Sequence, residues 1–118
     1  MAREMEESDM NFYQYQLEAE RTAKGLPHEQ RLVNFAMGLA GEAGEVVNYL
    51  KKVCFHGHEL DKNKLAEELG DCLWYIATLA NTVELWLDFI ADANIRKLQE
   101  RYPEGFSEER SKERAEGV

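Results

Sequence analysis

Apolar residues recur at steps of three and four along most of this chain, which is the spacing of amphipathic helices. The longest run begins after Pro27 and ends at His56-Gly57-His58, and Asp61 can then cap the helix that follows. The last run ends at Tyr102-Pro103-Glu104-Gly105, because Pro and Gly interrupt helices. The predicted helices cover residues 12–24, 28–55, 61–83 and 87–101.

The third predicted helix has the most regular apolar stripe, and we expect this stripe to face the core. Its members are Leu65, Leu69, Cys72, Leu73, Ile76, Leu79, Ala80 and Val83. The turn to the fourth helix must lie between Asn81 and Trp86, although no Gly or Pro marks it. Short connections between amphipathic helices predict an all-α fold, a four-helix antiparallel bundle. The predicted helical domain occupies residues 11–106, between a flexible acidic N-terminus, 1–10, and a charged C-terminal tail, 107–118, that is flexible or forms a short helix.

The charge balance narrows the classes of partner. The 118 residues include 23 acidic and 14 basic side chains, for a formal charge of −9, and the longest basic stretch is Lys51-Lys52. Such a chain lacks the positive surface that binding to a nucleic acid polymer requires. Its N-terminus has no apolar secretory segment, and the apolar stretch at residues 72–80 is too short to cross a membrane. We therefore expect a cytoplasmic protein without a membrane partner.

Two pairs of carboxylates stand out in the long helices. Glu42 and Glu45 are three residues apart, as are Glu68 and Asp71, so each pair lies on one side of its helix. If the loop around Gly57 folds these helices antiparallel, four carboxylates face one another, and their repulsion requires a cation between them. Ligand sets made only of oxygen favour Mg²⁺ or Mn²⁺ over zinc. The sequence thus predicts a metal site at these four residues.

The alternative is that both pairs are merely solvated, since acidic residues three apart are common on exposed helix faces. Two features argue for a site. The pairs are flanked by small or apolar residues, such as Leu39-Ala40-Gly41 and Cys72-Leu73-Trp74, and no basic residue follows any of the four carboxylates at the fourth position.

The segments 38–46 (GLAGEAGEV) and 67–75 (EELGDCLWY) resemble the E-x-x-E and E-x-x-D motifs of the MazG-like all-α nucleoside triphosphate pyrophosphohydrolases. Segments 94–98 and 101–106 are similar to that family's last helix and its end, and the resemblance covers roughly residues 11–107. It implies a dimer or tetramer that hydrolyses nucleoside triphosphates between the α- and β-phosphates, giving a nucleoside monophosphate and pyrophosphate. One departure is Val83-Glu84-Leu85-Trp86, where family members often have a polar cap or Gly.

Further residues are candidates for substrate contact. Tyr75 lies on the same stripe as Glu68 and Asp71 and is able to stack on a base, although core or interface packing is the commoner role of such a tyrosine. The family-like Asn-x-x-Lys pattern implies base or sugar contact for Asn94 and phosphate contact for Lys97. Asn48 and Lys52 extend the face of Glu45.

Three functions remain open from the sequence. The leading hypothesis is a Mg²⁺-dependent pyrophosphohydrolase in which Glu42 or Glu45 acts as the base, with both residues also among the metal ligands. The second is a nucleotide- or metal-binding regulatory module without turnover, and the third is a structural helical oligomerisation domain. The base and sugar preference depends on pocket shape, which periodicity does not supply.

Overall fold

A computed structural model describes residues 9–23 and 25–115 of this chain, and all regular elements within them are helices, as predicted. They are α1 (Phe12–Arg21), α2 (His28–Phe55), α3 (Lys62–Thr82), α4 (Leu87–Arg101) and α5 (Glu108–Ala115). The first four agree with the predicted ranges, and α5 lies in the predicted C-terminal tail. Residues 1–8 of the predicted N-terminal segment and residues 116–118 lie outside the described residues. Within the described part, no helix is both long and apolar enough to cross a membrane.

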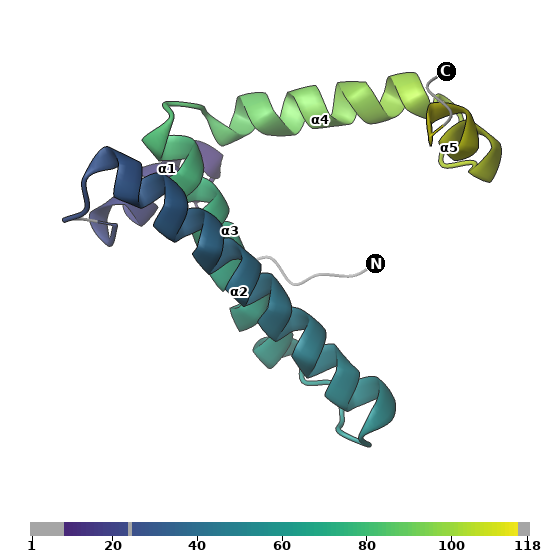
Figure 1. Ribbon diagram of the computed structural model, residues 1–118, viewed down its shortest axis with the longest axis horizontal. Helices are drawn as coiled ribbons and strands as arrows, with labels where there is room; N and C mark the ends of the chain where they lie inside the picture. Colours follow the sequence, from purple (N-terminus) through teal and green to yellow (C-terminus); the bar gives the residue numbers. More distant parts are fainter. Residues whose placement is uncertain (1–8, 24, 116–118) are drawn as a thin grey trace.

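Helices α2 and α3 form a long antiparallel hairpin that carries both acidic motifs (Figure 1). The turn between them is set locally. Gly57 adopts a left-handed φ of 74°, and the N–H groups of His56 and His58 both donate to the Lys52 carbonyl. Asp61 then caps α3, because its side chain accepts hydrogen bonds from the N–H groups of Asn63 and Lys64. The hairpin therefore places residues 42–45 opposite residues 68–71.

Helix α1 packs on the hairpin beside the N-terminal end of α2 and the C-terminal end of α3 (Figure 1). The small core at this end is formed by Ala19, Ala77, Ala80 and Leu87, with Trp74 packed against it. Polar contacts join the same elements: the Arg31 guanidinium donates to both carboxylate oxygens of Glu20 and to the Thr82 hydroxyl. We call this region, comprising α1, residues 28–35, residues 74–82 and Leu87, the head.

The corner between α3 and α4 has no glycine, yet it turns sharply. Glu84 takes the left-handed conformation, with φ of 58°, and the Leu85 N–H donates to the Ala80 carbonyl. No side chain next to α4 caps its start. The cap comes instead from α1, because the Gln16 Oε1 accepts a 2.7 Å hydrogen bond from the Leu87 N–H. This contact explains how the chain makes the turn although residues 83–86 include neither a polar cap nor a glycine.

Helix α4 contacts α1 but then extends away from the hairpin (Figure 1). The all-α class is confirmed, but α4 does not complete a closed bundle within the single chain. The predicted core stripe of α3 is also only partly right. Ala80 is buried as predicted, but Leu69, Ile76 and Val83 are exposed, and the other buried positions of α3 are Glu68, Ala77, Thr78 and Thr82. Within residues 9–23 and 25–115, the face of α3 that carries Leu69, Ile76 and Val83 is therefore left largely uncovered.

Candidate functional site

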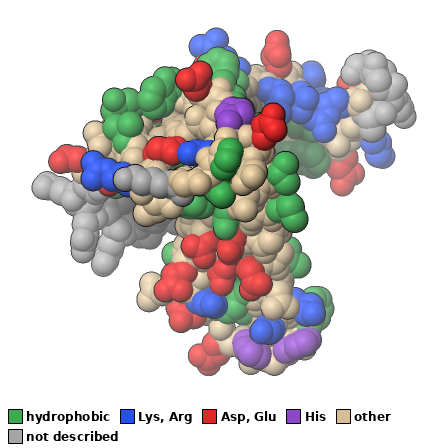
Figure 2. Space-filling model, turned by 60° about the vertical axis from the view of Figure 1, so that its left-hand side comes forward, with side chains coloured by type: hydrophobic (Ala, Val, Ile, Leu, Met, Phe, Trp, Pro, Cys, Tyr) green, Lys and Arg blue, Asp and Glu red, His purple; other side chains and the backbone are tan. Residues whose placement is uncertain are grey.

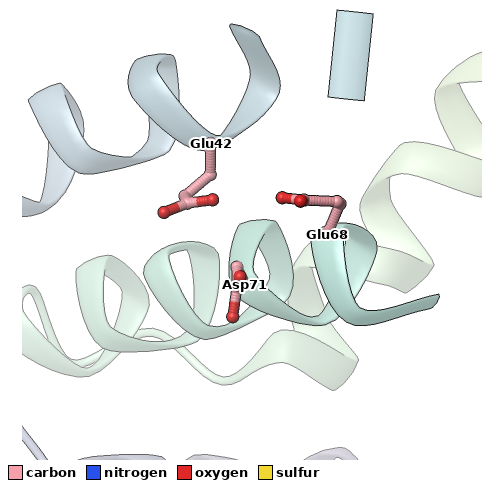
Figure 3. Close-up of side chains that lie close together, drawn as sticks. All are labelled: Glu42, Glu68 and Asp71. Atoms are coloured by element: carbon pink, nitrogen blue, oxygen red, sulfur yellow. The ribbon is translucent and has the colours of Figure 1, made fainter. Parts of the chain in front are cut away.

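The hairpin brings together three of the four predicted carboxylates (Figure 3). Glu42 of α2 and Glu68 of α3 point toward each other across the helix interface, and Asp71 lies beside them on α3. One carboxylate oxygen from each of the three lies within 4.8 Å of the others. Acidic side chains also dominate this face of the hairpin in the space-filling view (Figure 2). The i, i+3 spacing and the antiparallel hairpin are together sufficient to produce this arrangement.

The three carboxylates differ in their surroundings. Glu68 is 9% exposed, whereas Asp71 is exposed and Glu42 is intermediate. Partial desolvation raises the pKa of Glu42 above the usual carboxyl value, and the charges of Asp71, Glu68 and Glu45 raise it further. The charge of Asp71 also reaches α1, where burial first and Asp71 second raise the pKa of Tyr15. The site therefore has an excess of negative charge in the metal-free protein.

We call Glu42, Glu68 and Asp71 the trio. The fourth predicted ligand, Glu45, lies outside it. It is exposed, although it is close enough to raise the pKa of Glu42. A basic neighbour that the sequence argument overlooked is Lys64, whose Nζ lies 3.1 Å from the Glu68 Oε1. The signal for this pair is present in the sequence: Lys64 lies four residues before Glu68, so the two side chains share one face of the helix.

Tyr75 packs in the interface between α2 and α3. Its ring lies over Gly38, where an added methyl group would overlap it, and it also packs against Phe35 and Trp74. Trp74 in turn donates a 2.8 Å hydrogen bond to the Thr22 hydroxyl. These contacts account for Tyr75 as a packing residue, which was the commoner of the two roles considered from the sequence. They also explain why a glycine occupies position 38, although glycine is unfavourable inside a helix.

The remaining candidates for substrate contact do not all lie next to the trio within one chain. Asn48 and Lys52 are exposed on α2, between Glu45 and the hairpin turn. Asn94 and Lys97 are exposed on α4, which extends away from the hairpin (Figure 1). Tyr49, which sequence reasoning missed, accepts a 2.7 Å hydrogen bond from the Asp61 N–H and so ties α2 to the start of α3.

The trio has the chemistry of a site for a hard divalent cation. It offers only carboxylate oxygens, which Mg²⁺ and Mn²⁺ prefer, and one of its members is nearly buried. Two oxygens on opposite sides of a Mg²⁺ ion are about 4.2 Å apart, since each lies at about 2.1 Å. The three oxygens lie within 4.8 Å of one another, a limit close to this span. Glu42, Glu68 and Asp71 therefore fit such an ion.

Comparison with known proteins agrees with this geometry. The chain is 41% identical over 73 residues to the Gene 37 protein of Mycobacterium phage L5, an alignment that spans 58% of this chain and 64% of the phage protein. It thus spans slightly less than two thirds of that relative. No solved structure gives a significant match. Residues 30–106, which include both acidic motifs, match the MazG nucleotide pyrophosphohydrolase domain, and the chain therefore belongs to the MazG family.

Proposed function

We propose that this protein hydrolyses nucleoside triphosphates, canonical or modified, between the α- and β-phosphates in a Mg²⁺-dependent reaction. The products are a nucleoside monophosphate and pyrophosphate. The observation that carries the proposal is the trio of Glu42, Glu68 and Asp71 within 4.8 Å, in a chain of the MazG family. Nucleoside triphosphates occur in the cytoplasm, where we expect the enzyme to act on the nucleotide pool.

In this proposal Glu42, Glu68 and Asp71 hold Mg²⁺, with Mn²⁺ as a substitute. A bound divalent ion neutralises phosphate charge and orients the phosphoanhydride for attack. With Glu45 the site carries four carboxylates, and the triphosphate adds a similar charge. Productive binding therefore requires more than one divalent ion, some of which enter with the nucleotide.

The sequence left Glu42 and Glu45 as equal candidates for the base, and the geometry favours Glu45. Glu42 belongs to the trio and would therefore serve as a ligand of the ion. Glu45 lies one helical turn away and is exposed to water. A carboxylate in that position is able to orient a water molecule and accept its proton.

Substrate contacts would come in part from a second copy of the chain. Asn94 and Lys97 lie on α4, which extends away from the carboxylates of its own chain, so we propose that they reach those of a partner (Figure 1). Asn48 and Lys52 lie on the same helix as Glu45 and would contact the phosphate or sugar. Tyr75 would contribute mainly by positioning the two helices.

A homodimer or homotetramer is supported by apolar residues that one chain leaves exposed. Helix α2 has a stripe on the face opposite Glu42, which we call the α2 stripe, and α3 and α4 have further exposed apolar residues. The members of the α2 stripe are Val33, Met37, Ala40, Gly44 and Val47. Met37 and Val47 are 69% and 67% exposed. Sedimentation at micromolar concentration should show an oligomer that Met37→Asp weakens; a stable wild-type monomer would contradict this part of the proposal.

The activity itself is tested with a panel of ribo- and deoxyribonucleoside triphosphates, canonical and oxidised or methylated, each with Mg²⁺. We expect pyrophosphate release from at least one member of the panel. Asp71→Asn should abolish it, whereas Glu67→Gln, a neighbouring exposed carboxylate outside the trio, should retain it. Nucleotide binding without turnover would favour the regulatory module instead. The absence of both nucleotide and Mg²⁺ binding would leave the structural oligomerisation domain.

A further inference from the structure

Lys64 is a cationic side chain that pairs with the acidic site. Its ammonium lies 3.1 Å from the carboxylate of Glu68, the buried member of the trio, while about half of the Lys64 side chain remains exposed. Glu45 and Glu67 are also close enough for their charges to act on Lys64. Lys64 therefore reaches the trio from solvent, at the edge where Glu45 also lies.

Helix stability does not account for a lysine at this position. Lys64 is the third residue of α3, and the N-terminal turn of a helix favours anions over cations. A lysine four residues before a glutamate is also the weaker orientation of such a helical pair. The carboxylate of Glu68 does account for it, because a charge that is largely removed from water requires a partner.

Lys64 and a divalent cation compete for the same carboxylate. Once Glu68 binds the ion, the Lys64 ammonium lies beside two additional positive charges and is repelled. Because Lys64 lies at the exposed edge of the site, its flexible side chain is able to swing into solvent. The phosphate chain of a substrate is the strongest new anionic partner at that edge.

We propose that Lys64 holds Glu68 in the metal-free protein, is displaced by the divalent ion, and then binds the phosphate chain of the nucleotide. The inference rests on the proposed function and adds a phosphate-positioning residue to it. Lys64 would oppose binding of the ion alone but assist binding of the ion together with a phosphate. By linkage, the ion and the phosphate then strengthen each other's binding through this one side chain.

The test measures binding rather than turnover, and it needs no knowledge of the base. Calorimetry would follow Mn²⁺ alone, and then pyrophosphate at saturating Mg²⁺, for Lys64→Met and for the wild type. We expect Lys64→Met to bind Mn²⁺ alone about fivefold more tightly and pyrophosphate about five- to tenfold more weakly, as typical coupling energies imply. Lys62→Met is the matched control, since this exposed lysine lies in the same turn of α3 and has no ion pair among those recorded for the described residues. It should behave as the wild type does, and Lys64→Arg should retain the wild-type pattern because it keeps the charge.

Equal Mn²⁺ affinity for Lys64→Met and Lys62→Met would overturn the displacement, and an unchanged pyrophosphate affinity would overturn the phosphate contact. If no variant and no wild-type protein bound Mn²⁺, the metal site of the proposed function would itself be wrong, which distinguishes the two failures. Thermal melts in EDTA verify folding, and Lys64→Gln replaces Lys64→Met if the latter does not fold.

Discussion

The head and the rest of the α2–α3 hairpin show two different ways to use the same helix interface. In the head, small apolar residues are buried together with hydrogen-bonded polar side chains, Gln16 and Thr78, and the partly buried Arg31 also has hydrogen-bond partners. Between residues 36 and 73, by contrast, the described chain buries one residue, Glu68. We call this second region the acidic arm. Its interface contains charge where a core normally contains apolar side chains.

This difference indicates that the head stabilises the fold, whereas the acidic arm provides the residues that we propose for metal binding and catalysis. Burial of apolar area and paired polar groups stabilises the head. The acidic arm gains little from burial and loses stability through repulsion among Glu42, Glu45, Glu68 and Asp71, which a bound cation would relieve. We therefore expect variants in the head to change the free energy of unfolding, and variants of the carboxylates to change turnover or metal binding.

The largest expected effect is on turnover. Glu45→Gln should lower kcat by about 10² to 10⁴-fold, because it removes the proposed base, while the proposed metal ligands Glu42, Glu68 and Asp71 stay in place. Steady-state kinetics, Mn²⁺ calorimetry and a thermal melt on one preparation provide the measurement. Glu67→Gln serves as the control. Full activity in Glu45→Gln would assign the base elsewhere, and a lower melting temperature would contradict the separation of the two regions.

The second prediction concerns the head. Gln16 is 1% exposed, and it bonds to Asn81, the Leu85 carbonyl and the Leu87 N–H. Gln16→Ala leaves the buried Leu87 N–H and two partly buried groups without their partner, so we expect a loss of about 3 kcal/mol in the free energy of unfolding by urea titration. Gln14→Ala, at an exposed position of the same helix, should cost less than about 0.5 kcal/mol. A small effect of Gln16→Ala would show that the α3–α4 corner does not depend on α1.

The third prediction concerns the boundary between the two regions, at Gly38. Alanine there would overlap the Tyr75 ring, which is held between Phe35 and Trp74. Gly38→Ala should therefore destabilise the protein by about 1–2 kcal/mol, even after the gain in helix propensity. Gly70→Ala meets nothing within 4 Å and should instead stabilise it by up to about 1 kcal/mol. Denaturant titration of both variants would show whether the signs are opposite; a Gly38→Ala variant as stable as Gly70→Ala would exclude close packing as the reason for Gly38.

Local signals made the helix boundaries predictable from the sequence. The Asp61 cap, Pro27 and the Gly57 turn each act within a few residues, and the structure has a helix end at each. The exposed stripe of Leu69, Ile76 and Val83 was predicted as core. Periodicity identifies an apolar face but not which surface covers it, and the described part of the chain leaves this face exposed.

The site was predictable to the extent that it depends on helix geometry. Three of the four carboxylates meet because i, i+3 spacing and an antiparallel hairpin leave few alternatives. The cap on α4 was not predictable, because Gln16 and Leu87 are 71 positions apart in the sequence. The position of α4, which carries Asn94 and Lys97, was also not predictable, because local signals in the sequence do not show that this helix extends away from the hairpin (Figure 1).

The smallest expected effect, a dependence on pH, sharpens the comparison within the acidic arm. The pKa of Glu42 is raised, by desolvation first and then by Asp71, Glu68 and Glu45, so the folded state holds this proton more tightly than the unfolded state. Its contribution to stability is therefore present at low pH and is lost as the pH rises through the raised pKa. In EDTA, Glu42→Gln should be more stable than the wild type at pH 7, and the difference should shrink as the pH falls and Glu42 becomes protonated.

The control is Glu59→Gln, which replaces an exposed glutamate in the turn after α2 and should not reproduce this change of the stability difference with pH. Urea titrations from pH 4 to pH 8 measure the difference, and a wild type more stable than Glu42→Gln at pH 7 would mean that repulsion does not govern the metal-free arm.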